Sequence, residues 1–165
     1  MKFEDLLRTI MNGEVPEEAI ISLLTEIAAR GETEEELFQA AQVMREFSVP
    51  FAVNPEGIVD TCGTGGDGKG TFNFSTAAAL VVAGAGVKVV KHGNRAVSSK
   101  SGSADVLEKL GVRIEVEPVV MRQAMQEAGI AFLFAPRYHP AMKHVAAARK
   151  KLGFSIRPLR RDCFW

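Results

Sequence analysis

The chain has 165 residues, 47% of them hydrophobic, so it can bury a core as one domain or as a small domain with part of a larger one. Twenty basic residues balance twenty acidic ones, and the net charge of zero argues against nucleic acid or an anionic membrane as partner. Cys62 and Cys163 lie far apart without zinc-ligand spacing, and the N-terminus is unlike a secretory signal, so we expect a cytoplasmic protein.

The first fifty residues are expected to form three short amphipathic helices. Apolar residues recur with helical spacing in three groups: Phe3, Leu6, Leu7 and Ile10; Ile20, Leu23, Leu24 and Ile27; Leu37, Ala41, Met44 and Phe47. Pro16 suits a first helical turn, Gly13 and Gly31 suit C-terminal ends, and Thr33 with Glu36 has the spacing of a capping box. Residues 48–57, which contain two prolines, read as a linker.

After the linker, short β-rich runs alternate with helical ones. Strands are predicted at 57–60, 87–90, 112–116 and 130–134, and helices at 75–85, 103–110, 118–128 and 139–152. The longest apolar stretch, residues 77–87, is too short to span a membrane and is expected to be a buried helix entering a buried strand.

This alternation defines the fold class and the domains. Strands separated by helices need crossover connections, so we predict an α/β fold with a mostly parallel sheet covered by helices on both faces. The expected domains are 1–50, helical, and 51–153, α/β and incomplete. The tail 154–165 has no periodicity, and a sheet that stopped there would be truncated, with an unprotected edge.

A glycine-rich turn, GTGGDGKG, follows the first predicted strand, which ends at Asp60. Glycines permit close backbone approach, so consecutive N–H groups can converge on an anion, and the helix that follows adds its positive end. Phosphate is the expected ligand, and a tight solvent-exposed turn is the alternative. The spacing satisfies neither the P-loop nor the GxGxxG motif.

A second donor-rich stretch, KHGNRAVSSKSGSADVLEKLG at 91–111, follows the second predicted strand. It lies at the carboxyl end of that strand, the side on which open α/β sheets bind ligands. Such a loop could equally be a solvated surface turn when considered alone. Two donor-rich loops at one sheet edge favour a polyanion site.

These segments carry a resemblance. GTGGD at 63–67, NFST at 73–76 and the stretch 91–111 resemble the signature segments of the anthranilate phosphoribosyltransferases of tryptophan biosynthesis, and the similarity continues to RKKLG at 149–153. The resemblance implies transfer of the phosphoribosyl group from phosphoribosyl pyrophosphate (PRPP), held with Mg²⁺, to anthranilate. The products are N-(5-phosphoribosyl)anthranilate and pyrophosphate. It also implies a homodimer formed through the N-terminal helices.

The resemblance also implies residue roles. The pyrophosphate site would be lined by Gly63, Gly66, Asp67, Thr71, Asn73, Phe74, Ser75 and Thr76, with the Ser75 hydroxyl on the metal ion. The phosphoribosyl group would be covered by Lys91, His92, Gly93, Asn94, Arg95, Ala96, Val97, Ser98, Ser99 and Ser103. Anthranilate would contact Gly63, Asn94 and Arg149, the last through its carboxylate. These roles suit the residue types: amides and lysine for phosphate, a hydroxyl for a hard cation, guanidinium for a carboxylate.

No side chain is assigned as a catalytic acid or base, because displacing pyrophosphate depends mainly on positioning and on stabilising the leaving group. The resembling family continues for about as long again, with an acidic magnesium-binding pair, so the chain is expected to be truncated or frame-shifted after Gly153. The activity of this fragment alone stays open. Two alternatives stay open: a relative of the pyrimidine nucleoside phosphorylases, which lack KHGNR, and a non-catalytic fragment that binds phosphate or dimerises.

Overall fold

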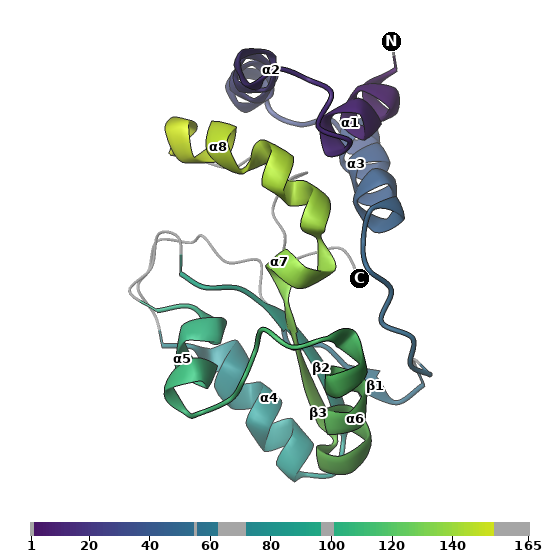
Figure 1. Cartoon of the computed structure of the whole chain (residues 1–165), viewed down its shortest axis with the longest axis vertical. Helices are drawn as coiled ribbons and strands as arrows, with labels where there is room; N and C mark the ends of the chain where they lie inside the picture. The colour runs from purple at the N-terminus through teal and green to yellow at the C-terminus, as the bar shows by residue number, and fades with distance from the viewer. Residues whose placement is uncertain (1, 55, 63–71, 97–100, 154–165) are drawn as a thin grey trace. The chain divides into compact units, whose positions relative to one another are not determined.

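The computed structural model describes residues 2–54, 56–62, 72–96 and 101–153 (Figure 1). The chain divides into two compact units, one of residues up to 49 together with those from 139 on, and one of residues 50–138. Within the described ranges, every helix is too short or too polar to cross a membrane.

The three N-terminal helices are confirmed. They are α1 (Phe3–Met11), α2 (Glu17–Arg30) and α3 (Glu34–Glu46). Their apolar stripes meet in one core that includes Ile10, Ile27 and Met44. The predicted capping box is present at the start of α3: the Glu36 amide donates to Thr33 Oγ1 at 3.2 Å, and the Thr33 amide donates to Glu36 Oε2 at 2.9 Å.

The helix predicted at 139–152 begins later and packs elsewhere than expected. A 3₁₀ turn, η1 (Pro140–Met142), comes first, with the Met142 amide bonded to the His139 carbonyl at 3.1 Å, and α8 (Lys143–Leu152) follows. We expected residues 139–153 to belong to the α/β domain. Instead Val145 and Ala148 are fully buried in the core of the helical unit, because the apolar stripe of α8 packs against α1 and α2.

The second unit contains a parallel sheet of three described strands in the order β1 (Ile58–Val59), β2 (Lys88–Gly93) and β3 (Ile130–Phe134). The helices α4 (Phe74–Gly84), α5 (Ser103–Lys109) and α6 (Pro118–Ala128) lie between the strands in the chain, and the short α7 (Ala135–Tyr138) follows β3. The predicted fold class, a helical region followed by a small parallel sheet with helices, is confirmed.

The strand predicted at 112–116 is wrong. The Val112 amide bonds back to the Leu107 carbonyl at 2.9 Å, which turns the chain at the end of α5, and the residues that follow join no strand. Ile114 is 3% exposed and packs with Leu107, Phe132 and other residues of α5 and β3. The alternating apolar pattern therefore reflects one buried anchor in a connecting segment and not a ladder of paired strands.

The apolar helix α4 is only half covered by the described residues. Ala79 and Thr76 are buried, but Phe74 is 67% exposed and Val81 is 72% exposed. The expectation of a buried helix therefore holds for one face of α4. The sequence could not distinguish the two faces because both are apolar.

Candidate functional site

Three residues of the second donor-rich stretch belong to strand β2, which extends beyond its predicted end at residue 90. Lys91 pairs with Phe132, His92 with Leu133 and Gly93 with Phe134 in register with β3. Lys91 is 3% exposed and His92 is fully buried. The strand was predicted to end before Lys91 because Lys91 is charged. Its aliphatic stem is nevertheless buried, as an apolar side chain would be, and the strand continues.

Lys91 connects the end of β2 to the first turn of α4. Its Nζ donates to Ser75 Oγ at 3.2 Å, and Thr61 Oγ1, just after β1, donates to the Ser75 carbonyl at 2.7 Å. Two predicted site residues from separate segments are thus brought into direct contact. The ammonium and the hydroxyl lie where the turn after β1, the start of α4 and the end of β2 meet.

Asp60 also lies at this junction and was not among the predicted site residues. Its Oδ1 accepts a hydrogen bond from the Cys62 amide at 2.7 Å and a longer one from the His92 amide at 3.4 Å. Desolvation raises the pKa of Asp60 above its ordinary value even though the residue keeps an exposed surface, and these amides and Lys91 act in the opposite direction. Its position directly after a short apolar run was the available signal.

The segment after β2 is held by the start of α5. The Asn94 carbonyl accepts from the Ala104 amide at 3.1 Å and from Ser103 Oγ at 3.4 Å. Asp105, which was not among the predicted site residues, accepts from the Ala96 amide at 2.8 Å. The structure therefore brings Asn94, Ala96 and Ser103 together at the start of α5.

Arg95 is engaged by acidic side chains. Its guanidinium lies 2.7 Å from both Glu108 and Glu115 and 4.8 Å above the centre of the Phe134 ring. The hydrogen bond to Glu108 is the largest of the effects that raise the pKa of Arg95. Contact with a substrate phosphate would have to compete with these two carboxylates.

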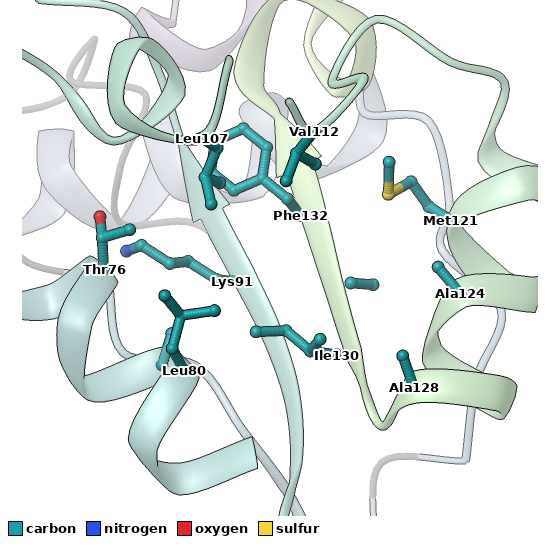
Figure 2. Close-up of a pocket in the computed structure, with 12 residues that line it drawn as sticks. Thr76, Leu80, Lys91, Leu107, Val112, Met121, Ala124, Ala128, Ile130 and Phe132 are labelled. Carbon is teal, nitrogen blue, oxygen red and sulfur yellow. The ribbon is translucent and has the colours of Figure 1, made fainter. Parts of the chain in front are cut away.

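An apolar cavity of about 200 Å³ lies beside this junction, between the sheet and the helices α4, α5 and α6 (Figure 2). Leu80, Leu107 and Met121 line it from the three helices, and Phe132 from β3. Figure 2 shows Lys91 reaching along the cavity toward Thr76. Because the other lining side chains are apolar, the cavity is suited to apolar groups and not to phosphate.

The other predicted site residues are divided among several parts of the chain. Gly63, Gly66, Asp67, Thr71, Val97, Ser98 and Ser99 lie outside the described residues. Asn73 precedes α4 as its N-cap residue, and Phe74 points largely to solvent. Arg149 is half-buried in the last turn of α8, within the helical unit.

The described part of the chain contains no cluster of three or more His, Cys, Asp or Glu side chains that could hold a metal ion. Ser75 nevertheless offers a part-buried hydroxyl oxygen with a cation beside it. Mg²⁺ often takes few protein ligands and is held mainly by water and substrate phosphates. Among the described residues, the predicted metal ligand Ser75 therefore supplies a single hydroxyl oxygen, and the Lys91 ammonium beside it favours an anionic, phosphate-bearing ligand.

Comparison with known proteins defines the class. A family model described as the a/b domain of a glycosyl transferase family matches residues 55–159, and the model of the helical bundle domain of the same family matches residues 2–48. The chain belongs to this glycosyl transferase family.

Within this family, the chain is similar to anthranilate phosphoribosyltransferases. It is 54% identical to those of Bacillus caldotenax and Geobacillus kaustophilus over 148 residues, or 90% of this chain. The matched part covers 61% of the Bacillus caldotenax protein and 43% of the Geobacillus kaustophilus protein. The crystal structure of the Thermus thermophilus enzyme gives a TM-score of 0.87 at 46% identity, covering 95% of this chain and 48% of that one. The Saccharomyces cerevisiae enzyme in complex with PRPP and Mg gives 0.85 at 30% identity, covering 97% and 48%. The resemblance is confirmed, and the chain spans about half the length of most of these relatives.

Proposed function

We propose that this chain provides the PRPP-binding part of an anthranilate phosphoribosyltransferase, which transfers the phosphoribosyl group of PRPP to anthranilate. The observation that carries the proposal is the buried Lys91, whose ammonium lies 3.2 Å from Ser75 Oγ, where β2 meets the first turn of α4. A lysine near the carboxyl end of a parallel strand, beside a hydroxyl in the first turn of a neighbouring helix, suits a polyphosphate with a bound cation. The structure of the Saccharomyces cerevisiae relative in complex with PRPP and Mg supports the proposal of these two ligands for this chain.

The proposed roles follow from the charges that develop in the reaction. Attack of the aromatic amine at C1 of the ribose builds positive charge on the sugar and negative charge on the departing pyrophosphate. Lys91 and the backbone amides of the glycine-rich turn would stabilise that negative charge, and the Ser75 hydroxyl would be a protein ligand of Mg²⁺. When bound, Mg²⁺ neutralises charge on the pyrophosphate. The residues from Asn94 to Ser103 would cover the phosphoribosyl group, and Arg149 would meet the anthranilate carboxylate.

Binding and turnover are tested separately because the chain spans about half of most relatives. Calorimetry with PRPP and MgCl₂ measures binding, and the loss of anthranilate fluorescence measures turnover. Binding with turnover supports the enzyme, while binding without turnover restricts the chain to a phosphate-binding module. Absence of binding contradicts the assignment of the site.

We further propose a cytoplasmic homodimer formed through the N-terminal helices. Phe38 of α3 supports an interface there, because this large apolar side chain is 60% exposed. Sedimentation over a range of concentrations measures the association, and Phe38→Glu is expected to weaken it. A species that stays monomeric at high concentration contradicts this proposal.

A further inference from the structure

We propose that Asp105 is a positioning residue that presets the phosphoribosyl part of the site, an inference that rests on the function proposed above. Asp105 lies in the first turn of α5. Its role would be to hold the backbone of Asn94–Ala96 in the conformation that receives the sugar phosphate.

A single oxygen atom of Asp105 makes the two contacts that matter. Oδ2 accepts from the Ala96 amide at 2.8 Å and from the Gly102 amide at 2.7 Å. These amides lie on either side of residues 97–100 in the chain. The carboxylate therefore joins the chain just after β2 to the start of α5 at one point.

The bond to Ala96 goes beyond what capping of α5 requires. An acidic residue in the first turn commonly bonds the amide three residues before it, and the Gly102 contact has this form. Ala96 is nine residues before Asp105, so this contact fixes tertiary structure. It adds to the bonds that the Asn94 carbonyl accepts from Ala104 and Ser103.

The surrounding hydrogen-bond donors keep Asp105 ionised. The two amides are the main cause of a lowered pKa, and Arg95 lowers it further. An ionised carboxylate accepts stronger hydrogen bonds than a neutral group, so the link persists at any pH above the ordinary range of an aspartic acid. The packing is also close, because a methyl group on Gly102 would meet the Ala96 nitrogen at 2.5 Å and the Asn94 oxygen at 2.6 Å.

The test uses two probes that occupy different parts of the proposed site. Ribose 5-phosphate reports on the phosphoribosyl part, and pyrophosphate with MgCl₂ reports on the glycine-rich turn. Asp105→Ala is expected to weaken ribose 5-phosphate binding by about tenfold or more, since it removes two charge-assisted hydrogen bonds, and to leave pyrophosphate binding unchanged. Asp105→Asn, which keeps an acceptor oxygen, is expected to recover part of the loss. Asp5→Ala, which removes an exposed first-turn aspartate of α1 bonded to Arg8, is the matched control and should change neither.

A structural readout separates failure of this inference from failure of the proposed function. In the wild-type protein, the amide resonances of Ala96 and Gly102 should shift together as acid protonates Asp105, with a common midpoint below the ordinary aspartate pKa. If the wild-type chain binds neither probe, the proposed function fails, and this titration still tests the contact. The inference is overturned if the two amides do not titrate together, or if Asp105→Ala weakens both probes equally or neither.

Discussion

Gly102→Ala is expected to disrupt the junction between β2 and α5. The backbone of Gly102 has an ordinary conformation, with φ −93° and ψ 173°, so alanine is not excluded by strain. The obstacle is space, because an added Cβ would lie 2.5 to 2.7 Å from backbone atoms of Asn94, Arg95 and Ala96. Backbone atoms cannot move aside like the end of a flexible side chain, so α5 would have to shift as a whole.

The size of the effect follows from what this shift would break. Overpacking typically costs about 1–3 kcal/mol, and each of the hydrogen bonds that join Asn94 and Ala96 to α5 contributes about 1 kcal/mol. Relief of the clash breaks some of these bonds, so we expect a loss of about 2–4 kcal/mol, which is a large part of the stability of a small domain.

Urea unfolding measures this loss, and Gly84→Ala provides the matched control. An added Cβ at Gly84 meets no atom within 4 Å. Since Gly84 ends α4, alanine there should leave the free energy of unfolding unchanged or raise it by up to about 1 kcal/mol. A Gly102→Ala protein as stable as the wild type would refute the close packing of α5 on the end of β2.

Three further changes test the helical unit and the phosphate site. Thr33→Ala should lower the stability by about 1 kcal/mol in thermal melts, because it removes the cap of α3. The hydrogen bond from Arg30 is the main cause that lowers the pKa of Glu36 from 4.5 to about 2. The stabilisation that this ion pair provides is therefore complete above pH 4.5 and is lost as the pH falls toward 2. Glu36→Gln should therefore reduce the fall of the melting temperature between pH 4.5 and 2. A fall as large as in the wild type would contradict the ion pair. Lys91→Met should weaken PRPP binding about 10- to 100-fold without lowering the melting temperature, and undiminished binding would remove Lys91 from the site.

Local signals predicted the elements whose ends are set by nearby residues. The helix at 118–128 and the strand at 130–134 have the predicted bounds because Pro118 suits the first position of α6 and Gly129 adopts the left-handed conformation after it. The start of α3 was predictable for the same reason, since both partners of the capping box lie within four residues.

Features that depend on distant contacts were not predictable from these signals. Residues 112–116 alternate as a strand would, yet only their packing on α5 and β3 determines that they do not pair. The apolar stripe of α8 could cover either a sheet or a helix bundle, and nothing local to residues 143–152 selects between them. A periodic pattern identifies a buried face but does not identify its partner.

The candidate site shows the same division between ligand-facing groups and the groups that position them. Lys91 and Ser75 could be selected from the sequence because ammonium and hydroxyl groups after strands are suited to phosphate. Asp105 could not, since a carboxylate is the wrong charge for a phosphate ligand, and its bond to Ala96 spans nine residues. Its one local signal was a glycine followed three residues later by an acid before an apolar helix, a pattern that predicts a helix start and no more. An acidic residue of this kind is therefore found only when the fold shows which amides it holds.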